Sequence, residues 1–221
     1  MPKTPSALTV PWSFKSIDSA QVSVNTLADG RIRYAIEHDL LRGVTPAMIV
    51  WFLNHMTDRL DVGGQNVQFY RLWHPVDHVA MTYLTSAVDG RNFGSGAQVR
   101  IQEVFQANPK YAIDVKANVE FLDETGFAHH ENILGLTVAR MQYSFTQVDA
   151  GTLYKNALTI GAKGESLISK FINTVVRPRV FPDQKGEAWI RHNIEEVGAF
   201  ESFLPDLYAT HADITPNSSK D

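Results

Sequence analysis

The sequence predicts an α+β fold in which a curved antiparallel sheet surrounds a long carboxy-terminal helix, with an internal cavity between the two. Three observations support this prediction. Alternating apolar and polar residues dominate the chain before Gly164, helical periodicity dominates after it, and one strand carries a face of small or slim side chains. A chain of 221 residues that is 44% hydrophobic can fill one core, so we expect a single domain over residues 1–221.

The composition excludes several classes of partner and chemistry. The net charge is −4 and the Lys and Arg residues are scattered, so we expect neither nucleic acid nor a membrane as a partner. Cysteine is absent, which excludes disulfides and thiol catalysis and leaves His and carboxylate side chains as metal ligands. The sequence lacks a signal peptide and an apolar run of membrane-spanning length, so a cytoplasmic location is expected.

The first predicted elements are a strand and a helix. The segment RIRYAIEH, residues 31–38, alternates between apolar and charged side chains, as a half-buried strand does. Thr45 is a good N-cap residue and Pro46 suits the first helical position. We therefore predict a helix whose apolar body is AMIVWFLNHM.

The next predicted strands carry two polar residues of interest. The segment NVQFYRLWH reads as a strand that Pro75 stops, which places His74 at a strand end. The segment AQVRIQEVF alternates again and puts Glu103 on the same face as Ile101 and Phe105. A carboxylate on an apolar face either reaches solvent at a sheet edge or serves a site.

A hairpin is predicted after these strands. The strand YAIDVKANVEF is followed by the turn LDETG and by a strand over ILGLTVARMQYSF. One face of the last strand carries mostly small or slim residues, namely Gly135, Thr137, Ala139, Met141 and Tyr143. That face could border a cavity or pack under a helix.

The last predicted elements are helical. Helical periodicity covers ESLISKFINTVV, breaks at RPRVFP and resumes in KGEAWIRHNIEEVGAF, residues 185–200. At 3.6 residues per turn, His192 and Glu196 fall within the apolar arc of this helix, whereas Glu195 falls on the polar side near Arg191. Residues 209–221 read as a flexible tail.

Glu196 needs a partner because an ionised carboxylate removed from water costs several kcal/mol. A divalent metal would supply one, and His192 one turn earlier is suitably spaced to share it. With His74 and Glu103, the set would hold two imidazoles, two carboxylates and a dication, without net charge. The alternative is a buried His–Glu or Arg–Glu contact.

At these residues the chain resembles the diacetylphloroglucinol hydrolase and phloretin hydrolase family, whose members are zinc-dependent. The resemblance rests on RLWHPVDH at 71–78, the acidic residue of VRIQEVF, the segment HHENILGLTVARMQYSFTQVDAGTLYKNALTIG, and WIRHNIEEVG. It implies a Bet v 1-like helix-grip fold and one Zn²⁺ per chain. The implied metal ligands are His74, Glu103, His192 and Glu196.

The resemblance also implies residues that contact the substrate. The resemblance places Asp77 in substrate binding. We also assign His78 to substrate binding from its place after Pro75, although His78 could instead orient His74 or be exposed. Tyr143 and His129 are placed in catalysis, where either could hold or protonate an oxygen of the substrate ring. Tyr143 could equally be sheet core with its hydroxyl at the rim.

The activity that the resemblance implies is hydrolysis of the carbon–carbon bond between an acyl group and a phenolic, phloroglucinol-type ring, releasing a carboxylic acid. The partner would be a small phenolic ketone, and a homodimer is possible. Two alternatives stay open. One is a metal-free carrier of a hydrophobic small molecule, and the other is a metal-dependent lyase or isomerase acting on a related polyketide or phenol.

Overall fold

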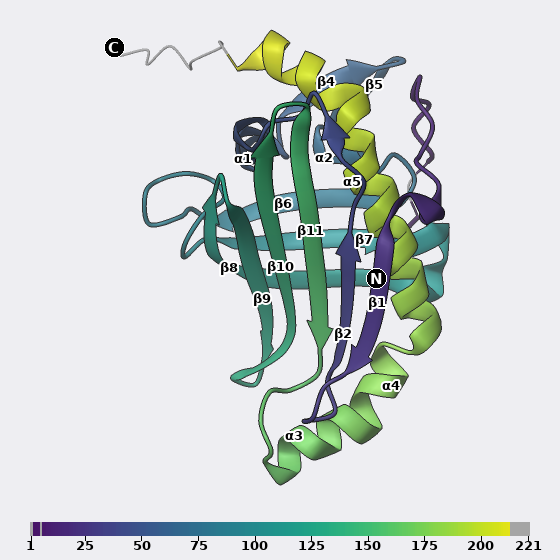
Figure 1. Cartoon of the computed structure of the whole chain (residues 1–221), viewed down its shortest axis with the longest axis vertical. Helices are drawn as coiled ribbons and strands as arrows, with labels where there is room; N and C mark the ends of the chain where they lie inside the picture. The colour runs from purple at the N-terminus through teal and green to yellow at the C-terminus, as the bar shows by residue number, and fades with distance from the viewer. Residues whose placement is uncertain (1, 5, 213–221) are drawn as a thin grey trace.

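A computed structural model describes residues 2–4 and 6–212 (Figure 1). The strands are β1 (Gln21–Thr26), β2 (Ile32–Glu37), β3 (Leu41–Arg42), β4 (Arg59–Val62), β5 (Gln65–Gln68), β6 (His78–Thr85), β7 (Gln98–Val104), β8 (Ala112–Asp123), β9 (Gly126–Ile133), β10 (Leu136–Val148) and β11 (Gly151–Ile160). The helices are α1 (Pro46–His55), α2 (Tyr70–Trp73), α3 (Leu167–Phe171), α4 (Arg177–Val180) and α5 (Asp183–His211), with short turns η1 (Ile17–Ser19), η2 (Phe105–Ala107), η3 (Pro109–Tyr111) and the π-helical η4 (Ile172–Val176).

Among the described residues, one large antiparallel sheet has the order β1-β2-β11-β10-β9-β8-β7-β6, and β3 pairs with β11. Strands β4 and β5 form a separate hairpin. Figure 1 shows that the sheet is strongly curved, with β6 and β7 running across the back of β9, β10 and β11 while α5 passes along one side. This arrangement confirms the predicted α+β helix-grip fold.

The region after the turn LDETG differs from the prediction. This turn connects β8 to β9, a strand that was not predicted. The chain then reverses at Leu134 and Gly135, which both have positive φ (51° and 79°), as a tight hairpin turn requires. The turn was not predicted, because the residues around Leu134 are apolar and Leu rarely adopts a positive φ.

The predicted first helix is confirmed, but the predicted strand before Pro75 is not. Thr45 caps α1 by accepting a hydrogen bond from the Met48 N–H at 3.2 Å, and Pro46 opens the helix. In contrast, the residues leading to His74 form β5 and then the one-turn helix α2. Tyr70, Leu72 and Trp73 are all buried within this turn, so tertiary packing overrides the strand propensity of the segment.

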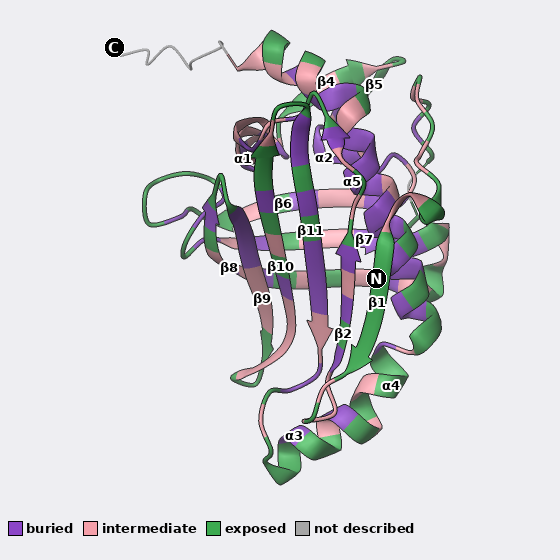
Figure 2. Ribbon diagram, viewed as in Figure 1, coloured by how far each residue is buried: buried purple, intermediate pink, exposed green. Residues whose placement is uncertain are grey.

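Helix α5 is the central element of the core. It is longer than the predicted helix and includes residues 209–211 of the expected tail, whereas residues 213–221 lie outside the described residues. Figure 2 shows that its buried residues face the sheet. Trp189 and Ile194 belong to one core cluster, with Tyr34, and Val197 and Phe200 belong to another, with Phe52. His192 and Glu196 therefore lie where the helix passes from one apolar cluster to the other.

Helix α5 approaches the sheet closely at Gly186. A Cβ at this position would lie 2.5 Å from the Tyr34 hydroxyl oxygen, so no larger residue fits without movement. The buried aromatic and aliphatic side chains of α5 each contribute about 1.5–3 kcal/mol to folding, which holds the helix against the sheet. The position of the polar residues on α5 is thereby fixed.

Candidate metal centre and ligand cavity

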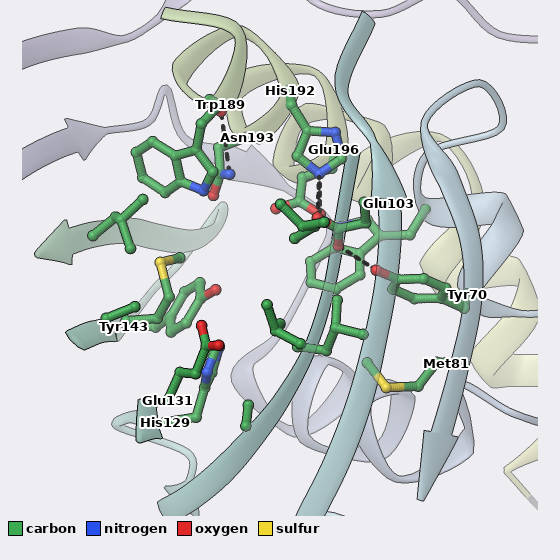
Figure 3. Close-up of a pocket in the computed structure, with 18 of the residues that line it drawn as sticks. Tyr70, Met81, Glu103, His129, Glu131, Tyr143, Trp189, His192, Asn193 and Glu196 are labelled. Atoms are coloured by element: carbon green, nitrogen blue, oxygen red, sulfur yellow. Dashed lines mark hydrogen bonds and ion pairs between the residues drawn. The ribbon is translucent and has the colours of Figure 1, made fainter. Parts of the chain in front are cut away.

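A cavity of about 140 Å³ lies between α5 and the inner face of the sheet. Its wall is mostly apolar and includes Phe93, Phe105, Phe127 and Leu158. An apolar cavity of roughly 150 Å³ holds benzene, so this cavity has room for one aromatic ring. Figure 3 shows polar side chains on two sides: those of α5 and β7 on one, and those of β9 and β10 on the other.

Two imidazoles and two carboxylates meet on the α5 side of the cavity, and we call His78, Glu103, His192 and Glu196 the quartet. His78 and Glu103 are directly opposite on β6 and β7, and His192 and Glu196 are one turn apart on α5. The His78 Nε2 lies 3.6 Å from Glu103 Oε1 and 3.3 Å from Glu196 Oε2. The His192 Nε2 lies 3.8 Å from Glu103 Oε2 and 3.7 Å from Glu196 Oε2.

Each imidazole of the quartet is oriented by a hydrogen bond at its other nitrogen. The Nδ1 of His78 lies 2.7 Å from the carbonyl oxygen of Tyr70, which can only accept, so Nδ1 carries the proton. The Nδ1 of His192 lies 3.0 Å from a carboxylate oxygen of Asp77. Both Nε2 atoms therefore point into the quartet, and that of His78 is buried without a hydrogen-bond partner. Metal-binding histidines are oriented in this way.

Besides its carbonyl, the side chain of Tyr70 contacts the quartet, and this residue was not identified from the sequence. Its ring stacks on His78 with centroids 3.8 Å apart, and its hydroxyl donates a hydrogen bond to Glu103. Burial, followed by the nearby Glu103 carboxylate, raises the pKa of Tyr70 well above its ordinary value, so the hydroxyl stays protonated. No sequence pattern marked Tyr70, because its role depends on the unpredicted helix α2.

Burial and mutual repulsion disfavour the ionised forms of Glu103 and Glu196 when no cation balances their charges. Burial raises the pKa of Glu196 to about 8, and Glu103 and Asp77 add to the effect while His192 opposes it. Burial alone would lower the pKa of His192, but the carboxylates of Glu196, Asp77 and Glu103 raise it to about 9. Burial keeps the pKa of His78 well below its ordinary value, so its Nε2 lone pair is free near neutral pH.

His74 differs from the prediction, because its nitrogens do not face the two glutamates of the quartet. Its Nδ1 accepts a hydrogen bond from the Asp77 backbone N–H at 3.0 Å. Its Nε2 therefore carries the proton and lies 3.2 Å from Glu195 Oε2. His74, Asp77 and His192 are also close enough together to hold a metal ion. Because the Nδ1 lone pair of His74 is occupied and the two predicted glutamate ligands lie near His78, we assign His78 to the quartet in place of His74.

Asp77 also differs from the prediction of substrate binding. It is 1% exposed and is not among the residues that line the cavity. One carboxylate oxygen receives the His192 hydrogen bond, and the other accepts from the Ala107 N–H at 3.1 Å. Asp77 thus orients His192. Glu195, which was predicted on the polar side of the helix, instead contacts both His74 and Arg191.

His129 and Tyr143 line the cavity from the sheet, opposite the quartet (Figure 3). Tyr143 stacks on Phe127 with centroids 3.7 Å apart. Burial raises the pKa of Tyr143 well above its ordinary value and lowers that of His129 to about 4, so both side chains are neutral near pH 7. Their predicted place beside the cavity agrees with the structure, whereas their catalytic role stays a prediction.

The quartet fits a zinc ion. It offers two imidazole nitrogens and two carboxylate oxygens, a donor set that zinc accepts. Ligands about 2.0–2.1 Å from a tetrahedral zinc lie about 3.3 Å from one another, close to the shorter distances in the quartet. The orphaned Nε2 of His78 would gain a partner, and a dication would balance the two carboxylates.

Among comparisons with known proteins, matches were found only to solved structures. No protein-family model and no curated protein matches the chain. Among solved structures, it is similar to Ara h 8.0201 (13% identity, TM-score 0.43, covering 80% of this chain and 99% of the other) and to a START superfamily protein from Mycobacterium smegmatis (15%, 0.49, 80% and 98%). It is also similar to BexL, a di-domain ARO/CYC protein from the BE-7585A biosynthetic pathway (7%, 0.47, 79% and 52%).

None of the helices within residues 2–4 and 6–212 combines the length and the apolar character that crossing a bilayer requires.

Proposed function

We propose that this protein is a metal-dependent hydrolase that holds one zinc ion in the quartet and cleaves the bond between an acyl carbon and a phenolic ring. The observation that carries the proposal is the pair of oriented imidazoles. The Nε2 atoms of His78 and His192 are directed at two buried carboxylates beside an aromatic-lined cavity. The resemblance of the sequence to zinc-dependent phenolic ketone hydrolases supports the same assignment.

Bound zinc would supply Lewis acidity, which polarises an oxygen that faces it and lowers the pKa of water. The chain's own residues do the rest. The stacked rings of Phe127 and Tyr143 form an apolar wall against which a substrate ring can lie. The protonated hydroxyl of Tyr143 can donate to a ring oxygen on the side opposite the quartet, which positions the acyl group toward α5.

The leaving group must be stabilised on the sheet side. When the ring is in its keto form, the electrons of the breaking carbon–carbon bond move onto a ring oxygen, and the ring carbon then takes up a proton. Tyr143 and neutral His129 both have a proton to donate and both line the cavity. Water contributes its hydroxyl to the carboxylic acid product and its hydrogen to the ring.

A second candidate is a metal-free carrier of a hydrophobic small molecule. The mostly apolar wall of the cavity favours it. In that case protons in place of a metal would satisfy the buried side chains of His192 and Glu196, since the pKa of each is raised above its ordinary value. The two candidates differ in whether the quartet takes up a metal.

The test is elemental analysis of the purified protein, beside His192→Ala and Glu196→Ala, followed by product analysis with an acylated phloroglucinol. We expect about one zinc per chain in the wild type, its loss in both variants, and release of a free carboxylic acid. Wild-type protein that takes up no zinc even after incubation with it would refute the proposal and favour the carrier. Zinc uptake with a product other than an acid would indicate a lyase or an isomerase.

A further inference from the structure

One polar residue of the cavity wall belongs neither to the quartet nor to the residues that the resemblance implied. Glu131 on β9 lines the cavity beyond His129, on the same strand face (Figure 3). It pairs across the sheet with Ala139, whose methyl side chain cannot donate a hydrogen bond to the carboxylate. The remaining wall here is apolar and includes Ile113 and Ile160.

The carboxylate of Glu131 has no protein partner among the described residues, which provide it with neither a hydrogen bond nor an ion pair. Lys185 is near enough to lower the pKa of Glu131, which burial raises, but its Nζ donates to the Ala112 carbonyl at 3.2 Å. Glu131 is half-buried, so water can reach it from the mouth of the cavity but a ligand would displace that water.

Glu120 on the neighbouring strand provides a matched comparison. Its carboxylate accepts hydrogen bonds from Arg140 at 2.8 and 2.6 Å, and the His130 ring nitrogen lies 3.0 Å away. Glu120 is absent from the cavity wall. The sheet thus supplies donors to a carboxylate outside the cavity and none to the carboxylate inside it, where an unpaired acceptor is costly once water is excluded.

We propose that Glu131 determines specificity by accepting a hydrogen bond from a ring hydroxyl of the ligand, at the end of the cavity away from the quartet. This inference rests on the proposed function, which supplies the class of substrate. It narrows that class to aromatic ketones that carry a hydroxyl group distal to the acyl group. An apolar ring without such a donor leaves the carboxylate desolvated and unpaired. Glu131 therefore selects polyhydroxylated rings over deoxygenated ones.

The test is isothermal titration calorimetry on protein treated with a chelator, using trihydroxyacetophenone and acetophenone as probes. Glu131→Gln keeps the shape but removes the charge, and Glu131→Leu removes the acceptor. A hydrogen bond to a charged group is worth about 1.5–3 kcal/mol, so we expect about tenfold or greater loss of trihydroxyacetophenone affinity in Glu131→Leu and a smaller loss in Glu131→Gln. Acetophenone affinity should not fall in either variant.

Glu120→Gln is the control, and it should leave the affinity for both probes unchanged; circular dichroism verifies that each variant folds. Equal losses for the two probes, no loss for either, or wild-type protein that binds neither would overturn the inference. Because the chelated protein is used, these outcomes are independent of zinc uptake and hydrolysis. If the separate elemental analysis finds no zinc uptake, the hydrolase is refuted, but a hydroxyl preference that depends on Glu131 would still preserve the inference.

Discussion

Two histidines face the same cavity from opposite walls, and the protein gives them opposite affinities for a proton. Burial lowers the pKa of His129 to about 4, with little compensation from the distant Glu120. Burial acts on His192 in the same direction, but three carboxylates outweigh it and raise the pKa to about 9. The protein thus favours a positive charge on His192 and keeps His129 neutral near pH 7.

The walls also differ in how firmly their polar groups are held. His78 and His192 each have a hydrogen bond at Nδ1, and Asp77 is itself fixed by the Ala107 N–H. On the sheet wall, Tyr143 is held by ring stacking, which leaves its hydroxyl for a ligand. We infer that the rigid wall is the place for an ion and the other wall the place for a variable organic group.

The largest expected effect concerns the choice between His78 and His74. His78→Ala should weaken zinc binding by about 100- to 1,000-fold, because four ligands share about 10–16 kcal/mol in a zinc site. His74→Ala should retain stoichiometric zinc, since His74 does not face the quartet glutamates. Competition with a chromogenic chelator measures both affinities. The reverse ranking would restore His74 as the ligand and refute the assignment of His78.

A smaller loss of zinc affinity is expected when Asp77, which contacts His192 from outside the quartet, is substituted. Asp77→Asn removes the charge opposite His192 Nδ1 with little change in shape, and loss of such a partner weakens metal binding by about 10- to 100-fold. Zinc titration monitored by the same chelator measures the loss. Glu195→Gln, which alters the partner of His74 instead, should change zinc affinity little. Equal effects of the two substitutions would contradict an orienting role specific to Asp77.

Because burial keeps His129 neutral, we expect the stability of the protein to depend on pH. The pKa of His129 is about 4 in the folded chain and ordinarily 6.5, so the unfolded chain binds more protons between these values. The free energy of unfolding should therefore fall as the pH drops from 6.5 toward 4, by about 2 kcal/mol from this residue. Urea denaturation should show a shallower pH slope in His129→Gln, and identical slopes would contradict the shift.

The smallest effect is expected for Tyr143→Phe. This substitution keeps the ring that stacks on Phe127 and removes one hydrogen-bonding hydroxyl, which is worth about 0.5–1.5 kcal/mol. Trihydroxyacetophenone should bind about two- to tenfold more weakly, measured by calorimetry on chelated protein, and zinc affinity should not change. Loss of zinc in this variant would show that the two walls are not independent.

Periodicity alone located the parts of the site that lie on long elements. The alternation around Glu103 placed it on an apolar strand face, and 3.6-residue periodicity placed His192 and Glu196 on the buried arc of α5. Both patterns reflect which side of an element is buried, and burial is what the sequence encodes most directly. The helix-grip architecture followed from the order of these elements.

The choice within WHPVDH could not be made from the sequence. His74 and His78 are both buried, and they differ in which nitrogen is already engaged. In His78 the Nδ1 atom donates to the Tyr70 carbonyl, whereas in His74 the Nδ1 atom accepts from the Asp77 N–H. The positions of these two backbone groups depend on the fold of α2 and of the loop after it. Asp77 was misplaced for the same reason, because its partner His192 is 115 residues away in the chain.

That separation also has a consequence for biosynthesis. At about 5–20 residues per second, a ribosome takes on the order of ten seconds to travel the 115 residues from Asp77 to His192. During that interval the strands that carry His78 and Glu103 have been made, but the helix that closes the cavity has not. Because His192 and Glu196 lie on α5, the proposed metal centre can be complete only after α5 has been synthesised.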